Sequence, residues 1–590
     1  MDCKESILSN EVYDYITDYS LENVDFQQTI ICYESIEDYY NIVYLNKSAM
    51  PRLEADLFEY QSIPKLYGLM QVETGSGIIG GGVESVFDPS NLIASGITQV
   101  QGPPLNLTGQ GVVVGIIDTG IDYTVPAFRD ESGGSRIMAI WDQTIQTGTP
   151  PEGFLYGSEY TREDINRALQ SENPYEVVPS RDENGHGSAL AGVAAGSNVR
   201  VGAQYVGAAP NADIVVVKLK ECKQYLRDFY LVPEGVPAYQ ENDIMLAVKY
   251  VDSFALETQR PVVICIGLGT NMGDHAGSMA LSRYLSMVAI KRSRAVVVCG
   301  GNEGNAAHHF QGNLLQSTMS SPGGQRIMDN QSGIYQDVEV RVNEGSAGFL
   351  LEFWGSMPDI FNISVISPGG EVIPPIRLGV RQGITYGFVY EKSKITIDST
   401  LVEPASGEEL ILFRLQEPTA GIWTFRVMST GELHNGIFHM WLPITDFLNV
   451  PVYFLSPSPY ITLTEPAMAS EVISVSTYNA DNRSFYINSG RGFSRTGEIR
   501  PDFAAPGVDV STITGSRTGS SFAAAITAGA VAQFMQWAVV ERNNEFVESR
   551  EIRSYFIRGT QKNADTVYPN REWGYGRLDL EGVFTSLTYA

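Results

Sequence analysis

Short, continuously hydrophobic runs alternate with amphipathic helical patterns in the first half of the chain. The runs are GVVVGIID, ADIVVVKL, RPVVICIGLG and AVVVCGGN, with helical patterns such as NDIMLAVKYV and SRYLSMVAIKR between them. Strands without polar alternation are buried on both faces, and intervening helices supply the crossovers of a parallel sheet. The pattern predicts an α/β fold, with helices on both faces of a parallel sheet, from residue 97 to 316.

Residues 317–450 show a different pattern, in which short strands of alternating hydrophobic and polar residues are separated by turns. VEVRV, FNISVIS, KITIDS and GIWTFRV are typical, and no helical run separates such segments. Alternation places one face of each strand in a core, which favours an antiparallel sandwich. We predict a jelly roll inserted into the α/β domain, which resumes over residues 451–590 with the strand EVISVSTYN and the long helix SFAAAITAGAVAQFMQWAVV.

The amino-terminal residues form a third pattern. β-rich runs such as QTIICY and NIVYL occur there with the acidic helical segment MPRLEADLFEY, which starts at Met50. We predict a small α+β unit over residues 1–71, followed by a glycine-rich connector without periodicity over residues 72–96.

Composition and charge narrow the function classes. The 590 residues are 43% hydrophobic and 18% charged, as in globular chains that bury a core. Forty Lys and Arg against 68 Asp and Glu leave a net charge of −28, which repels phosphate backbones and anionic lipid. We therefore expect no nucleic acid and no membrane as partners. No apolar stretch approaches the roughly eighteen residues that a membrane span needs.

The amino terminus and the cysteines bear on the cellular compartment. No basic segment precedes an apolar run in MDCKESILSNEVYDY, so we expect no signal peptide and synthesis in the cytoplasm. The five cysteines are odd in number, far apart and without a CxxC pair, which argues against a disulfide framework or a zinc site. Cys265 and Cys299 lie in apolar runs and are expected to be buried thiols.

Three segments place a reactive side chain beside glycine at a strand end or a helix start. Asp118 ends GVVVGIID, His186 lies in NGHGS, and Ser521 lies in TGSSFAAA at the start of the long helix. Each alone is more often a turn cap, a structural histidine or a helix cap. Together they supply a nucleophile, its base and an orienting carboxylate in one of the known chain orders. Ser520 is a competing nucleophile, and Asn302 is a candidate donor to an oxyanion.

These segments resemble the subtilisin-like serine protease family in local sequence and in order. The resemblance rests on VVVGIIDTGID, NGHGSALAGVAAG, GAAPNADIVVVKL, VVVCGGNEGN, and RPDFAAPGVDV followed by GSSFAAA. It implies a subtilisin-like fold, a triad of Asp118, His186 and Ser521, and Asn302 as the oxyanion-hole side chain. The usual Gly-Thr-Ser-x-Ala-x-Pro box reads Gly-Ser-Ser-Phe-Ala-Ala-Ala here, and neither change removes a proton-transfer group. The spacing of the box favours its second serine as the nucleophile.

The architecture is similar to that of the Csp-type germination proteases of spore-forming clostridia. QSIPKLYGLM and PTAGIWTFRV look like their prodomain end and a jelly-roll strand. This resemblance implies that residues 1–71 are an intramolecular chaperone, with autoprocessing near Gln71 or, alternatively, in the connector up to Gly96. It also implies limited proteolysis of a zymogen, such as a spore cortex-lytic precursor, by a protein carried in the spore.

The resemblance further implies an S1 pocket, which receives the side chain before the cleaved bond. Its expected walls are Gly267, Leu268, Gly269, Gly300 and Gly301, although such glycines also serve ordinary tight turns. We expect no cofactor and no metal. We expect a monomer whose partners are a protein or peptide substrate and its own prodomain.

Three other hypotheses compete with this interpretation. A pseudoprotease that binds or signals is the rival to an active peptidase. Trp354, Trp423 and Trp441 could be platforms of a carbohydrate-binding insert, although aromatic residues at alternating strand positions are usually core. The pairs Asp274–His275 and His308–His309 could ligate a metal, but without matching partners we expect them to be solvated.

Overall fold

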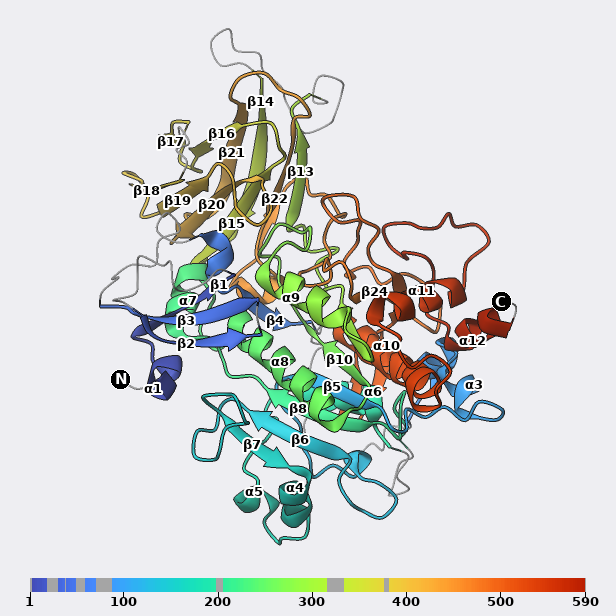
Figure 1. Cartoon of the computed structure of the whole chain (residues 1–590). Helices are drawn as coiled ribbons and strands as arrows, with labels where there is room; N and C mark the ends of the chain where they lie inside the picture. The colour runs from blue at the N-terminus through green and yellow to red at the C-terminus, as the bar shows by residue number, and fades with distance from the viewer. Residues whose placement is uncertain are drawn as a thin grey trace.

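The computed structural model describes most of the chain (Figure 1): residues 3–18, 30–37, 39–48, 59–70, 87–197, 205–315, 334–375 and 381–588. The predicted helical segment from Met50, the cleavage residue Gln71 and most of the connector at 72–96 lie outside these ranges.

An eight-stranded sheet forms the centre of the molecule, in the order β25-β24-β12-β10-β5-β8-β6-β7. Its neighbouring strands run parallel except at the edge, where β7 is antiparallel to β6. All six residues of β5 are buried, which explains why this strand reads as a continuous apolar run. The strands are β5 (Val113–Asp118), β6 (Ile137–Asp142), β7 (Ser158–Thr161), β8 (Asp213–Lys218), β10 (Val262–Ile266), β12 (Arg294–Cys299), β24 (Ile473–Tyr478) and β25 (Phe503–Pro506). The predicted α/β fold is confirmed.

Helices cover both faces of this sheet (Figure 1). On one face α6 (His186–Ala195) packs against α10 (Ser520–Met535), and on the other α8 (Glu241–Thr258) packs against α9 (Ala280–Ala289). Further helices in the described part of the catalytic domain are α2 (Ser90–Ala94), α3 (Ile97–Gln101), α4 (Arg162–Leu169), α5 (Pro174–Val177), α7 (Gln224–Tyr230), α11 (Ser549–Gly559) and α12 (Leu580–Thr588).

The helix α10 corrects one expectation about apolar stretches. Together with the π-helical turn Gln536–Val540 it is long and apolar enough to cross a membrane by length and composition. However, 83% of its most apolar window is buried inside the protein, and every residue of Ser520–Met535 is buried. This segment therefore has the environment of a central core helix.

The amino-terminal unit is a three-stranded antiparallel sheet, β1-β3-β2, preceded by α1 (Cys3–Leu8). Its strands are β1 (Val12–Thr17), β2 (Ile30–Ile36) and β3 (Tyr40–Asn46), and apolar residues of this sheet share a core with α8. A disulfide joins Cys3 to Cys32, with 5.7 Å between the Cα atoms. The expectation of no disulfide is wrong, because the fold of this unit brings together two cysteines that no local spacing pairs. Cys265 and Cys299 are buried free thiols, as predicted.

The inserted domain is a sandwich of two antiparallel sheets around its own apolar core. One sheet contains β13 (His309–Asn313), β15 (Gly348–Gly355), β18 (Arg381–Gly387), β19 (Lys394–Thr400), β20 (Glu409–Gln416) and β22 (Ile437–Trp441). The other contains β14 (Tyr335–Val342), β16 (Phe361–Ile366), β17 (Val372–Ile373), β21 (Gly421–Ser429) and β23 (Val452–Phe454). Strands β13 and β23 extend these sheets past the predicted limits of 317 and 450.

The tryptophans and histidines singled out from the sequence are buried. Trp354, Trp423 and Trp441 are at most 1% exposed, so none is a surface platform for a sugar. His275, His308 and His309 are at most 5% exposed, and His275 stacks on Trp441 with 4.2 Å between ring centroids. The expectation that these histidines are solvated is wrong. No group of three or more potential metal ligands is arranged to hold an ion within the described ranges.

Candidate active site

The three predicted triad residues come from the same edge of the central sheet. Asp118 is the last residue of β5, His186 is the first residue of α6, and Ser521 is the second residue of α10. The start of α6 lies so close to the loop after β5 that a Cβ at Gly187 would be 2.2 Å from the carbonyl oxygen of Gly120. Glycine at position 187 therefore lets the histidine approach the carboxylate.

These three side chains have the geometry of a catalytic triad, in which a histidine activates a serine as the nucleophile. His186 Nδ1 is 2.8 Å from Asp118 Oδ1, and His186 Nε2 is 2.9 Å from Ser521 Oγ. All three residues are fully buried. In this arrangement the imidazole takes the proton of Ser521, and the carboxylate fixes the tautomer and stabilises the imidazolium.

Neighbouring polar groups hold this triad in place. Asp118 Oδ1 also accepts a hydrogen bond from the Thr119 N–H, at 2.8 Å. The Thr119 hydroxyl accepts from the Gly187 N–H (2.9 Å) and donates to Asp182 Oδ1 (2.8 Å), and Asp182 also accepts the backbone N–H groups of Gly185 and Ser188. The sequence patterns did not single out Asp182, whose carboxylate ties the two catalytic loops together.

Asn302 lies where a donor to the oxyanion is needed. It follows β12, and its Oδ1 accepts a hydrogen bond from the Ser520 N–H at 3.0 Å. That bond orients the amide so that Nδ2 faces away from Ser520, and Nδ2 is buried with no hydrogen-bond partner in the described part of the chain. Asn302 therefore offers an unused N–H pair. Ser520 is tied to Asn302 through its backbone, whereas Ser521 carries the hydroxyl that meets His186.

The end of the amino-terminal unit occupies the catalytic cleft as a β-strand. Strand β4 (Leu66–Leu69) lies between β11 (Leu268–Gly269) and β9 (Tyr239–Gln240) and is antiparallel to both. The Met70 N–H donates to the Gly267 carbonyl at 3.1 Å, and the Met70 carbonyl accepts from the Ser521 N–H at 3.2 Å. A peptide carbonyl at the N–H of the nucleophile is in the position of a substrate carbonyl in an oxyanion hole. Met70 therefore occupies the P1 position, and Gln71 would follow the bond presented to Ser521.

Of the predicted S1 wall residues, Gly267, Leu268 and Gly269 lie along β4 and Met70. A Cβ at Gly269 would lie 3.3 Å from Met70 Cγ, and Gly267 faces Ser521. A Cβ at Gly300 or Gly301 would instead meet Leu463 or Thr464, so these glycines allow a second segment to pack close to the pocket. The sequence did not identify Thr464 as a residue beside the pocket, because no motif surrounds it and it follows the insert in the chain.

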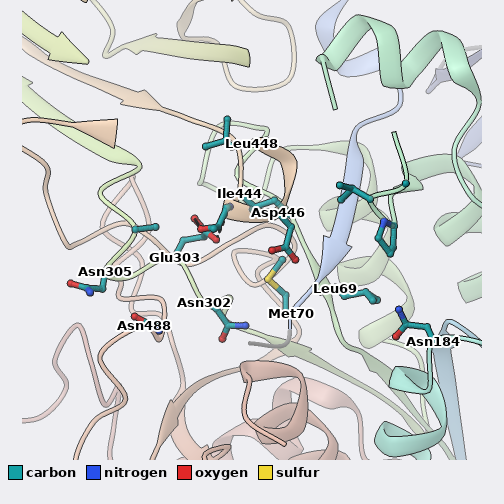
Figure 2. Close-up of a pocket in the computed structure, with 15 residues that line it drawn as sticks. Leu69, Met70, Asn184, Asn302, Glu303, Asn305, Ile444, Asp446, Leu448 and Asn488 are labelled. Atoms are coloured by element: carbon teal, nitrogen blue, oxygen red, sulfur yellow. Dashed lines mark hydrogen bonds between the residues drawn. The ribbon is translucent and has the colours of Figure 1, made fainter. Parts of the chain in front are cut away.

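A cavity of about 840 Å³ adjoins this site (Figure 2). Met70 and Asn302 lie on one side of it, and Ile444, Asp446 and Leu448 of the inserted domain line another wall. The insert thus forms part of the cleft in which a peptide binds, a role that its sequence did not suggest.

Buried polar contacts hold the amino-terminal unit against the catalytic domain. The Asp14 carboxylate is 2.5 Å from Lys223 Nζ and accepts from Gln240 Nε2 at 2.6 Å. Lys65 and Glu241 exchange hydrogen bonds: the Lys65 N–H donates to Glu241 Oε2 (3.0 Å), and the Glu241 N–H donates to the Lys65 carbonyl (2.9 Å). These contacts place β4 at the start of α8.

Glu352 joins all three units. Its Oε1 accepts from the Tyr60 hydroxyl at 2.5 Å, and its Oε2 accepts from the Gly273 N–H at 3.1 Å and from Trp354 Nε1 at 3.0 Å. Tyr60 belongs to the amino-terminal unit, Gly273 to the catalytic domain, and Glu352 and Trp354 to β15 of the insert. Burial raises the pKa of Glu352 to about 7, and the hydrogen bond from Tyr60 opposes this shift.

Comparison with known proteins supports the assignment made from this geometry. A model of the subtilase family matches residues 109–327 and 456–576. The structure of the Clostridium perfringens CspB protease is 30% identical, with a TM-score of 0.72, and the match covers 85% of this chain and 100% of that one. The Arabidopsis thaliana subtilisin-like protease SBT2.1 is 35% identical over 100 residues, which span 15% of this chain and only 12% of the plant protein.

The family match falls on both halves of the α/β domain and includes Asp118, His186, Asn302 and Ser521. The match to CspB extends over most of the chain, including segments outside the family model. The chain therefore belongs to the subtilase family of serine endopeptidases and is close to its Csp-type members.

Proposed function

We propose that this protein is a serine endopeptidase that cleaves its own amino-terminal unit at the Met70–Gln71 bond. The observation that carries the proposal is the hydrogen bond from the Ser521 N–H to the Met70 carbonyl, in a cleft where the triad is assembled. Residues 1–70 would then be a prodomain whose last strand is the first substrate.

The reaction follows from the contacts of the triad. Ser521 Oγ bonds to the Met70 carbonyl carbon as its proton moves to His186 Nε2, while Asn302 Nδ2 and the Ser521 N–H stabilise the oxyanion. His186 then gives the proton to the nitrogen of Gln71, and the peptide bond breaks. Water then adds to the acyl carbon of Met70 while His186 takes its proton, and His186 returns that proton to Ser521 Oγ as the ester bond breaks and the Met70 carboxyl group leaves.

Expression of three chains tests this proposal. The wild-type chain and Ser520→Ala should appear as two fragments, residues 1–70 and 71–590, because Ser520 contributes its backbone N–H and not the attacking hydroxyl. Ser521→Ala should remain one chain of 590 residues. An intact wild-type chain, or a cleaved Ser521→Ala chain, would contradict the proposal.

We also propose that the mature enzyme activates a protein zymogen by limited proteolysis. The resemblance to Csp-type germination proteases supports a spore cortex-lytic precursor as that zymogen and the spore as the location. The test is incubation of such a precursor with processed wild-type protein and with Ser521→Ala. A single new fragment with the wild type alone supports the proposal, and an unchanged precursor contradicts it.

One observation favours a second candidate, a binding protein whose own prodomain permanently fills its cleft. Met70 is only 2% exposed, and Asp14, Lys65 and Tyr60 all anchor the unit that carries it. A chain that processes itself but never cleaves the precursor, and never reacts with a serine-directed probe after processing, would support this candidate.

A further inference from the structure

Gly68 is two residues before Met70 and faces a turn of the inserted domain. It therefore occupies P3, the third position before the bond presented to Ser521. A Cβ at Gly68 would lie 2.5 Å from Ile444 Cδ1 and 3.3 Å from Phe447 Cε1. The residue pairs with Gly269 in regular strand geometry, and its φ does not lie in the left-handed region. Space, and not backbone conformation, therefore favours glycine at this position.

The two faces of β4 pack against different parts of the protein. Leu66 and Met70, on the same face as Gly68, belong to the apolar cluster that contains Ile444 and Phe447. Tyr67 and Leu69, on the opposite face, belong to the cluster of α8 and α9. Ile444 and Phe447 of the insert thus form a wall over the face of β4 that carries Gly68, the P3 residue.

Hydrogen bonds hold the turn that carries Ile444 and Phe447 against the catalytic domain. The Thr445 N–H and hydroxyl donate to the Glu303 carboxylate at 3.1 and 3.2 Å, and Glu303 directly follows Asn302. Asn271 Nδ2 donates to the Leu442 carbonyl at 3.1 Å. Ile444 and Phe447 are each 1% exposed, and Ile444 also lines the adjoining cavity, so a side chain at position 68 must push the Ile444 Cδ1 atom out of its packed position toward that cavity.

The composition of the amino-terminal unit agrees with a steric requirement. Glycine makes up 58 of the 590 residues, yet residues 1–71 contain a single glycine, at position 68. The one residue without a side chain in this unit is thus at the point where the insert leaves no room for one.

We propose that Ile444 and Phe447 of the inserted domain close the S3 subsite and restrict the protease to peptide strands with glycine two residues before the P1 residue. This proposal rests on the proposed function, since it concerns the selectivity of the same cleft. Substrates cleaved by the enzyme, its own prodomain first, then have the form Gly-x-x before the cleaved bond, with apolar residues such as Leu69 and Met70 at P2 and P1.

The test compares self-cleavage rates of full-length chains. Gly68→Ala should slow cleavage about 10-fold, and Gly68→Leu at least about 100-fold, because overpacking a filled site is costly. Adding Ile444→Ala should bring Gly68→Ala back to within about 3-fold of wild type, since it removes the atom nearest the new methyl group. Leu448→Ala is the matched control: Leu448 lines the same cavity from the same turn but is not among the nearest contacts of Gly68, so it should give no rescue.

A second readout is independent of catalysis. In the Ser521→Ala chain, amide hydrogen exchange at Met70 reports whether β4 is seated, because that N–H is bonded to the Gly267 carbonyl. Gly68→Leu should speed exchange there, and Ile444→Ala should restore protection to the Gly68→Ala chain. Wild-type cleavage rates and protection in both Gly68→Ala and Gly68→Leu, or no rescue of Gly68→Ala by Ile444→Ala, would overturn the proposal. Failure of the wild type to cleave would instead refute the proposed function, and the exchange result would still decide the subsite.

Discussion

The hydroxyl of Tyr60 makes one of the contacts that keep the amino-terminal unit in the cleft, and Tyr60→Phe removes only that contact. The ring, 6.0 Å from the Trp354 ring, is retained. Glu352 is only 2% exposed, and in the variant its Oε1 loses the hydroxyl donor that lies 2.5 Å away. Its Oε2 keeps the hydrogen bonds from the Gly273 N–H and Trp354 Nε1. Loss of a buried hydrogen bond to a charged group costs about 1.5–3 kcal/mol, or about a 10- to 150-fold change in an equilibrium constant.

The effect should depend on pH. Burial raises the pKa of Glu352 to about 7, so the carboxylate is ionised at pH 8 and protonated at pH 6. Removal of the donor costs less free energy when the carboxyl is neutral, because burying an unpaired neutral group costs less than burying an unpaired charge. We therefore expect a larger effect of Tyr60→Phe at pH 8 than at pH 6.

The assay is the rate at which a fluorophosphonate probe labels Ser521 in the processed protein. The probe reaches Ser521 only when β4 leaves, because the Met70 carbonyl occupies the Ser521 N–H. Tyr60→Phe should speed labelling by about 10-fold or more at pH 8. Tyr250→Phe is the matched control, since Tyr250 donates to Glu159 at 2.6 Å entirely within the catalytic domain. Equal labelling rates for wild type and Tyr60→Phe at both pH values, or equal acceleration by the control, would refute the reasoning.

Three further predictions concern catalysis and stability. His186→Ala should slow self-cleavage by about 10⁶-fold without unfolding the chain, and Asn302→Ala should slow it by about 10²- to 10³-fold, the losses known for these roles in subtilisin. Quenched time courses measure both rates, circular dichroism checks the fold, and near-wild-type rates would contradict the assignments. Burial raises the pKa of Glu352 to about 7 and that of Glu409 to about 8, above the ordinary value of 4.5. The folded chain therefore holds protons that the unfolded chain has released, and its stability should fall as pH rises from 6.5 to 8.5. Urea unfolding of Ser521→Ala measures this slope, Glu409→Gln should reduce it, and a stability that rises over this range would contradict it.

The fold and the triad were predictable because their signals are local. Strands buried on both faces, such as β5, have no polar alternation, and the ends of parallel strands meet at one edge of a sheet. Asp118 ends such a strand and Asn302 follows one, while His186 and Ser521 lie at the starts of helices of small residues that pack closely. Three motifs in a fixed order therefore suffice to place the chemistry.

The remaining features depend on contacts between distant segments. Ile444 approaches Gly68 across more than 370 residues of chain, and Glu352 joins Tyr60 across 292. No periodicity or motif marks such pairs. The same reason explains two errors. Cys3 and Cys32 meet only when the small sheet folds, and His275 is buried by contacts with distant segments, namely the Trp441 ring of the insert and the Leu463 carbonyl.

The position of β4 also sharpens where cleavage should occur. The predicted amino-terminal unit ended at Gln71, and the strand that the structure describes ends with the Met70 carbonyl at Ser521. The bond presented to the nucleophile is therefore the one before Gln71, and not one in the connector up to Gly96.

The most direct test of the account is the intact mass and amino-terminal sequence of the large fragment formed by the wild-type protein. The account predicts a mature chain that begins at Gln71 and is absent from Ser521→Ala. A large fragment that begins anywhere else, or one that also forms in Ser521→Ala, would contradict it.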